Sequence, residues 1–152
     1  MIKVRAIEIK DIDQVYNHTC FLANNSGVLE PDFVLTKNRM RKDLFCTENN
    51  WHGLVVTDGT EIIGSCLYGF VNTNRPFNQT SCLFLDTLFI ESMYRKQGIG
   101  RLLMNELIQI AKNNQLTRIE FWCLKNNIVA NEFYIELGAT TVDKLNVYNL
   151  NV

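Results

Sequence analysis

The chain has 152 residues, 47% of them hydrophobic and 20% charged, which is the composition of one ordinary globular domain with a sizeable core. The formal net charge is only −1, so no overall basic field exists to hold nucleic acid or an anionic membrane, and neither is expected as a partner. No apolar run reaches about 18 residues and the N-terminus lacks the apolar region of a signal peptide. We therefore expect a single domain over residues 1–152 and a cytoplasmic location.

The first part of the chain predicts a strand followed by two helices. Apolar and polar residues alternate from Ile2 to Ile9, as in a half-buried strand. Asp11 then suits a helix cap, and the stretch Asn24-Asn25-Ser26-Gly27 ends that helix. A second, rather polar helix is expected to begin at Pro31-Asp32 and to run to about Glu48.

The middle of the chain predicts three antiparallel strands in succession. Residues 53–57 and 61–71 are strand-like runs separated by Asp58-Gly59, a dipeptide that favours a tight turn. A polar loop at 72–78 precedes a long apolar run from Ser81 to Ile90. These runs predict a hairpin and a third strand beside it.

The last part of the chain predicts two helices and three short strands. Apolar residues recur at helical spacing over 99–111, a strand follows from Thr117 to Cys123, and a second helix runs from about Asn127 to Leu137, closed by a glycine cap. Val142 and residues 146–150 supply short terminal strands. The whole order indicates one α+β domain with about seven strands and about four helices.

Cysteine and histidine give little support to a metal site or a nucleophile. No C-x-x-C pair occurs, and free cysteines are commonly buried, so reduced core thiols are the favoured interpretation. Neither His18 nor His52 belongs to a ligand-like pair, and no metal is expected. No spacing in the sequence links a histidine to a cysteine, but the two residue types could still be neighbours in the folded chain. The five cysteines are Cys20, Cys46, Cys66, Cys82 and Cys123.

A basic, glycine-bearing loop joins the strand Phe84–Ile90 to the next helix. This loop reads Arg95-Lys96-Gln97-Gly98-Ile99-Gly100-Arg101. A helix N-terminus offers unpaired N–H groups and partial positive charge, and two glycines let the backbone approach an anion closely. Because neither G-x-G-x-x-G nor a P-loop is present, we predict a diphosphate other than a dinucleotide or nucleotide of those classes. A plain strand, turn and helix with solvated basic side chains is the alternative.

Arg95, Gly98 and Gly100 fill the pattern [QR]-x-x-G-x-[GA], and on this loop the sequence resembles the GNAT family of N-acetyltransferases. The resemblance spans most of the chain and is strongest over residues 84–139. Within the family the chain is most similar to the diamine (spermidine/spermine-type) and thialysine acetyltransferases. The residues that carry this similarity are Tyr94-Arg95-x-x-Gly98-Ile99-Gly100 and Asn127-x-x-Ala130-x-x-Phe133-Tyr134-x-x-Leu137-Gly138-Ala139. The resemblance implies the GNAT fold, a mixed, mostly antiparallel sheet splayed between its fourth and fifth strands.

The resemblance also implies which residues bind acetyl-coenzyme A (acetyl-CoA), the acetyl donor. Backbone amides of the loop hold the pyrophosphate, a strand pairs with the pantetheine arm, and a helix start flanks the arm near its thiol. The loop residues are Arg95, Lys96, Gln97, Gly98, Ile99, Gly100 and Arg101. The strand residues are Leu88, Phe89 and Ile90, and the helix residues are Asn127 and Ala130.

Tyr134 and Asp86 are the catalytic residues that the resemblance implies. Tyr134 matches the family tyrosine that protonates the departing thiolate, a role that a phenol with a pKa of about 10 can fill at neutral pH. A core aromatic is the alternative for Tyr134. Asp86 matches a glutamate of the diamine branch that helps water to remove a proton from the incoming ammonium, and a solvent-facing strand residue is its alternative. The next position is acidic in that branch but is Thr87 here, which weakens a polyamine assignment.

The sequence therefore predicts transfer of an acetyl group from acetyl-CoA to the primary amine of a polyamine-like or amino-acid-like small molecule. The amine attacks directly in a ternary complex, in a cleft between the strands that end near Ile90 and Cys123. Asp86, the 24–32 loop and Trp122 are expected to line this cleft. A protein lysine or N-terminal acetyltransferase and a non-catalytic acyl-CoA-binding module are the alternatives, and a homodimer is left open.

Overall fold

The computed structural model describes residues 1–25, 34–48, 51–71 and 81–143. The chain divides into two compact units, Met1–Trp122 and Cys123–Val152. Within the described residues, no helix is long and apolar enough to cross a membrane.

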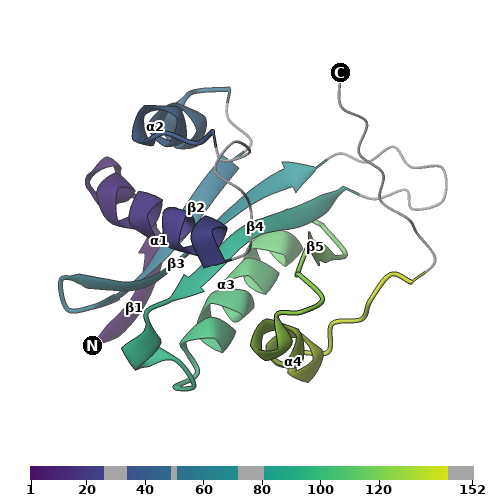
Figure 1. The fold of residues 1–152 in the computed structure, drawn as a ribbon. Coiled ribbons are helices and arrows are strands. Elements are labelled where there is room, and N and C mark those ends of the chain that lie inside the picture. The colour runs from purple at the N-terminus through teal and green to yellow at the C-terminus, as the bar shows by residue number, and fades with distance from the viewer. Residues whose placement is uncertain (26–33, 49–50, 72–80, 144–152) are drawn as a thin grey trace. The chain divides into compact units, whose positions relative to one another are not determined.

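The first unit is built on a five-stranded sheet in which the strands follow one another in chain order, β1-β2-β3-β4-β5 (Figure 1). Neighbours pair antiparallel up to β4, and β5 joins β4 in parallel. This confirms the α+β class and the three successive antiparallel strands. The strands are β1 (Ile2–Ala6), β2 (Trp51–Asp58), β3 (Glu61–Val71), β4 (Cys82–Ile90) and β5 (Ile119–Phe121).

Helices cover both faces of this sheet (Figure 1). On one face, α1 (Ile12–Asn25) and α2 (Lys37–Phe45) pack over Leu67 of β3 in a cluster that includes Val15, Met40 and Val55. Tyr68, the residue after Leu67 in β3, points to the other face, because side chains alternate along a strand. Tyr68 accordingly lies close enough to Glu106 of α3 (Ile99–Asn113) for the carboxylate to contribute to its raised pKa of about 12, of which burial is the main cause.

The β2–β3 hairpin forms as the sequence predicts. Gly59 closes it with φ of +60°, a left-handed conformation that glycine adopts without a steric penalty. Gly64 then lets β3 approach β4 closely, since a Cβ atom there would lie 2.8 Å from Ile90 Cδ1 and 2.9 Å from the Phe89 carbonyl oxygen. A side chain at position 64 would therefore clash with the C-terminal end of β4.

A bulge interrupts β4 at Asp86. Thr87 pairs with Leu67, whereas the neighbouring pair is Leu85 with Tyr68, so Asp86 has no partner residue on β3. On the other edge β5 pairs only with residues 83–85 of β4. Among the described residues, β4 beyond the bulge is thus paired on one side alone. This is the splay between the fourth and fifth strands that the GNAT resemblance implies.

The first helix begins at Ile12, directly after Asp11, as the sequence predicts, whereas the second helix begins later than expected. Asp11 closes a short 3₁₀ turn, Ile9–Asp11, before α1, where its carboxylate accepts the Glu8 N–H at 2.8 Å and pairs with the Arg5 guanidinium at 2.6 and 2.9 Å. The second helix begins at Lys37 because the Thr36 hydroxyl accepts the Arg39 N–H at 3.2 Å as an N-cap. Its expected start at 31–33 lies outside the described residues, and it ends at Phe45, not near Glu48.

The C-terminal helices follow their sequence patterns. The spacing in α3 is confirmed, because it buries one stripe of apolar side chains, namely Ile99, Leu103, Met104, Leu107 and Ala111. In the second unit, α4 (Ile128–Glu136) begins at the Asn127 cap and ends before Gly138, which has φ of +90°. Val142 is not in a strand, and residues 146–150 lie outside the described residues, so five strands are described where about seven are expected.

The five cysteines are all free. Cys66 and Cys82 are buried, and burial raises the pKa of the Cys66 thiol to about 12. Cys46 is exposed, so the expectation of core thiols holds only for part of the set. The described residues contain no group of three or more His, Cys, Asp or Glu side chains that could hold a metal ion.

Candidate active site

The connection from β4 to α3 keeps backbone N–H groups available for an anion. After β4 the chain makes a 3₁₀ turn, Ser92–Tyr94, and Lys96 and Gly98 then adopt positive φ of 58° and 83°. Gly98 is the N-cap of α3 and provides no side-chain cap. The first helical hydrogen bond runs from the Leu102 N–H to the Gly98 carbonyl at 2.9 Å, so the amides of Ile99, Gly100 and Arg101 precede it. Such a helix start attracts phosphate groups.

The space beside Gly98 is open. A Cβ atom built on this glycine would meet no atom within 4 Å apart from its own chain neighbours. The residues that the sequence assigns to pyrophosphate binding, Lys96 to Arg101, therefore lie around an accessible helix start with no capping side chain. The assignment of a diphosphate to these residues stays a prediction.

The Arg95 side chain turns back toward β4. Its Nε donates to the Ile90 carbonyl at 2.8 Å, and its guanidinium carbon lies 5.9 Å from the centre of the Phe89 ring. Arg95 thus ties the end of β4 to the loop. Its positive charge lies beside Leu88–Ile90, the strand segment that is expected to pair with the pantetheine arm.

Asp86 lies at the bulge and faces solvent. Although part of its surface is accessible, the protein atoms around the carboxylate raise its pKa through desolvation. On the same strand the Phe84 ring packs edge-on against Trp122 at 5.3 Å, and Trp122 remains 77% exposed. Asp86 and Trp122 are thus both accessible, as an acceptor site requires. The 26–33 part of the expected cleft lies outside the described residues.

The remaining predicted residues lie together on α4 in the second unit. The Asn127 side chain accepts the Ala130 N–H at 3.2 Å, which fixes the helix start. Tyr134 is half-buried and packs beside Phe133, with ring centres 5.2 Å apart. The structure thus places Asp86, Leu88–Ile90 and the Arg95–Arg101 loop in the first unit, and Asn127, Ala130 and Tyr134 in the second.

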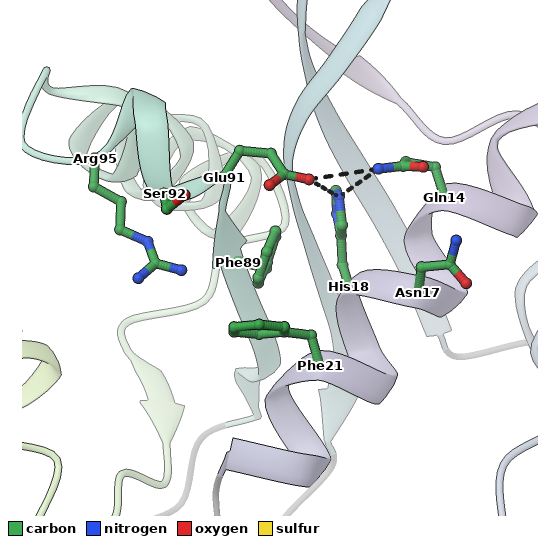
Figure 2. Close-up of a pocket in the computed structure, with 8 residues that line it drawn as sticks. All are labelled: Gln14, Asn17, His18, Phe21, Phe89, Glu91, Ser92 and Arg95. Carbon is green, nitrogen blue, oxygen red and sulfur yellow. Dashed lines mark hydrogen bonds and ion pairs between the residues drawn. The ribbon is translucent and has the colours of Figure 1, made fainter.

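A pocket with a volume of about 210 Å³ lies between α1 and the C-terminal end of β4 (Figure 2). Its polar centre is His18, which is 3% exposed and stacks on Phe89 with ring centres 4.2 Å apart. The lining residues are Gln14, Asn17, His18, Phe21, Phe89, Glu91, Ser92 and Arg95. The Arg95–Arg101 loop and this pocket therefore share Arg95.

Hydrogen bonds hold the His18 ring on both sides. Nδ1 lies 2.8 Å from the Ser65 hydroxyl, and Nε2 lies 3.2 Å from Glu91 Oε1 and 3.1 Å from Gln14 Nε2 (Figure 2). Burial lowers the pKa of His18, and the Glu91 carboxylate opposes that shift. The sequence does not predict this group, because His18 and Glu91 are 73 positions apart. The available signal was a histidine at helical spacing on the apolar face of Ile12 and Val15.

Sequence and structure comparisons now define the class of protein. The Acetyltransferase (GNAT) family profile matches residues 13–139, and the chain belongs to this family. Solved structures with the same fold include a possible acetyltransferase from Clostridium difficile 630, with a TM-score of 0.81, 20% identity and coverage of 100% of this chain and 98% of that one. An aminoglycoside 6'-N-acetyltransferase from Acinetobacter baumannii has a TM-score of 0.78 and 18% identity, with coverage of 100% and 99%.

Among characterised sequences, the chain is similar to two proteins of the polyamine branch. The spermine/spermidine N(1)-acetyltransferase of Bacillus subtilis (strain 168) is 29% identical over 79 residues, which are 51% of this chain and 52% of the relative. A probable spermine N(1)-acetyltransferase of B. subtilis subsp. natto (strain BEST195) matches to the same extent. The chain thus spans about half the length of these relatives. Their names agree with the branch that the motifs indicate.

Proposed function

We propose that this protein is an acetyl-CoA-dependent N-acetyltransferase that acetylates the primary amine of a polyamine-like or amino-acid-like small molecule. The observation that carries the proposal is the β4–α3 segment. There, among the described residues, a bulged strand is paired on one side only beyond Leu85 and is followed, after a short turn, by a helix start with open space at Gly98 and no capping side chain. Membership of the GNAT family supports the same donor.

The donor would bind along this segment. The pyrophosphate fits the N–H groups from Lys96 to Arg101, because a helix start with a free concavity favours phosphate. The pantetheine arm fits the edge of β4 at Leu88, Phe89 and Ile90, where an added strand would satisfy backbone groups that β5 does not pair. Asn127 and Ala130 are proposed to flank the arm near its thiol.

The reaction would be a direct transfer. A neutral amine attacks the thioester carbonyl carbon, and a backbone N–H near Leu88 stabilises the oxyanion. The C–S bond breaks as the thiolate leaves, and we assign its protonation to the Tyr134 hydroxyl. No covalent enzyme intermediate is part of this proposal.

The acceptor is proposed to be a small cationic amine. Asp86 supplies an accessible carboxylate at the bulge, and the names of the two Bacillus relatives point to spermine and spermidine as their own substrates. Thr87 replaces the second acidic residue of that branch, so amino-acid-like amines belong in the same search.

A screen for coenzyme A thiol release tests the proposal. Purified protein and acetyl-CoA are incubated with polyamines, amino acids, aminoglycosides and lysine-containing peptides. Release with small amines, together with a mass increase of one acetyl group on the amine, would support it. Turnover on peptides alone would favour a protein acetyltransferase. Binding of acetyl-CoA without release on any amine would favour the non-catalytic module.

A further inference from the structure

His18 is a buried polar side chain with no task in the chemistry described so far. Its side chain is 3% exposed, yet it lines a pocket, and its neighbour Glu91 is 36% exposed at the pocket's edge. A neutral imidazole has one N–H donor and one acceptor nitrogen, and a histidine that only fills the core satisfies both with two partners. His18 has close polar neighbours at both nitrogens, from α1, from β3 and from the residue after β4.

These contacts are consistent with one assignment of the ring proton. The Gln14 amide nitrogen lies 3.1 Å from His18 Nε2 and 3.5 Å from Glu91 Oε1, so its two hydrogens can be donated to both atoms. Nε2 is then an acceptor, and the ring proton lies on Nδ1, which donates to the Ser65 hydroxyl oxygen at 2.8 Å. The single lone pair of Nε2 then accepts the Gln14 N–H, and Glu91 Oε1 lies 3.2 Å from the same nitrogen.

Protonation at Nε2 would improve this arrangement. The Nε2 to Oε1 distance of 3.2 Å would become a charge-assisted hydrogen bond between imidazolium and carboxylate. The network therefore contains an acceptor for one proton and a counter-charge for the cation that results. Phe89 stacks on the ring and holds its plane.

The cluster of His18, Gln14 and Glu91 adjoins β4, the strand that is proposed to hold the donor. Glu91 follows β4 directly and is three residues beyond Leu88, which is about 10 Å at the rise of a strand. Side chains alternate beyond the bulge, so Thr87, Phe89 and Glu91 point to the face that α1 covers. A chain of about three hydrogen-bonded waters would span this distance.

We propose that His18, held by Glu91 and Gln14, accepts the proton that the acceptor's ammonium group must lose before it attacks. This inference rests on the proposed function. Of the three N–H protons of the ammonium, one moves through pocket water to Nε2 and later leaves by Glu91 to solvent. A second replaces the proton that Tyr134 gives to sulfur, and the third stays in the amide. The freed nitrogen lone pair forms the new C–N bond as the C–S bond breaks.

The charges around His18 determine the pH dependence. Among the described residues, Glu91 and Arg95 are the charged groups that line the pocket with it, while Ser65 of β3 and Phe89 of β4 are neutral. On the α2 side of α1, Lys37 pairs with Asp13. Burial lowers the pKa of His18 below its usual value of about 6.5. The base is therefore neutral and competent at neutral pH, and activity is lost as pH falls through the lowered pKa.

The test measures kcat/KM for the most active amine from about pH 5 to pH 9, across the histidine range. We expect a rising limb below about pH 6.5 in the wild type. In His18→Gln the limb should vanish and kcat/KM should fall about 10²-fold, because a positioned base contributes about 10²–10⁴-fold. The KM for acetyl-CoA should change by less than about threefold.

Glu91→Gln keeps the experiment decisive if His18→Gln does not fold, because Glu91 is partly exposed. Removing the carboxylate lowers the pKa of His18 further, so the limb should move to lower pH and the plateau should drop about tenfold. His52→Gln is the matched control. His52 is half-buried, with a pKa lowered by burial, but it stacks on Tyr68, meets Phe70 edge-on and lies outside the pocket.

The outcomes separate the two proposals. A wild-type profile retained in both His18→Gln and Glu91→Gln would overturn the role of His18 while leaving the acetyltransferase intact. A limb that follows the pKa of each amine and not the enzyme variant would overturn it as well. Failure of the wild type to release thiol with any amine would reject the proposed function itself.

Discussion

The β2–β3 hairpin and the β4–α3 connection both turn at a glycine with positive φ, yet they use their backbone groups differently. Gly59, at +60°, brings two strands together that pair from Trp51 to Asp58 on one side and from Glu61 to Gly69 on the other. Gly98, at +83°, begins a helix whose first turn has no side-chain cap. In the hairpin the turn serves pairing, and in the connection it keeps N–H groups available.

The difference shows that the hairpin uses its backbone hydrogen-bonding groups within the fold, whereas the β4–α3 connection leaves them available for a ligand. Buried strands such as β2 are stable because their backbone groups find partners within the sheet. A helix start that points to open space leaves its donors to solvent or to a ligand. Substitutions in the hairpin should therefore change stability, whereas substitutions in the connection should change binding.

The largest effect is expected outside both regions, at Tyr134 on α4. Tyr134→Phe keeps the ring and its packing beside Phe133 but removes the proton donor, so kcat should fall about 10²–10⁴-fold while acetyl-CoA still binds. Steady-state kinetics at saturating substrates and calorimetry with acetyl-CoA check this. Turnover within a few-fold of wild type, with chemistry shown to be rate-limiting, would leave water as the proton source.

A loss of binding with the fold retained is expected at Gly100. Gly100→Asp puts a side chain and a negative charge at the second residue of α3, beside the proposed pyrophosphate site, and should weaken acetyl-CoA binding by about 10²-fold or more. Gly100→Ala is the control, since it adds a methyl group without charge and the motif accepts alanine there. If calorimetry finds that the Asp variant binds acetyl-CoA with the affinity of the wild type, the pyrophosphate does not bind at this loop.

The hairpin should show the opposite behaviour. Gly59→Ala forces a Cβ atom into a left-handed conformation, which costs about 1–2 kcal/mol of unfolding free energy. Nothing lies within 4 Å of the new atom, so the cost comes from the backbone and not from packing. Urea denaturation measures it. An unchanged midpoint, or a change in acetyl-CoA affinity, would contradict the division between the two regions.

The smallest effect is expected at the bulge. Asp86→Asn should raise the KM of a cationic amine by about 3–10-fold without altering acetyl-CoA affinity, because it removes attraction for the cation alone. Because the pKa of Asp86 is raised, the wild type should lose this attraction, as the pH falls, at a higher pH than an ordinary aspartate would, whereas the amine KM of the variant should not show this change. Asp43→Asn on α2, where Asp43 pairs with Arg39, is the control. Identical constants for every amine would exclude Asp86 from the acceptor site.

Local patterns were enough to predict the elements of the fold. Alternation gave the strands, helical spacing gave α3 and α4, and Asp58-Gly59 marked the hairpin, because each of these features depends on neighbours in sequence. The start of α2 was predicted less well than the starts of the other helices. Thr36 decides where α2 begins, because its hydroxyl accepts the Arg39 N–H. A threonine three residues before a helical amide is only a weak signal of a helix start in the sequence.

The sequence by itself determined the family motif, the strand that leads to it and the residues proposed to bind and activate the donor, because all of them lie within short segments. Only the tertiary structure placed Asp86 at a bulge, since that depends on the register between β3 and β4. It alone brought His18 to Glu91 and Ser65, because helix packing on a sheet, and not distance along the chain, decides which polar groups share a pocket.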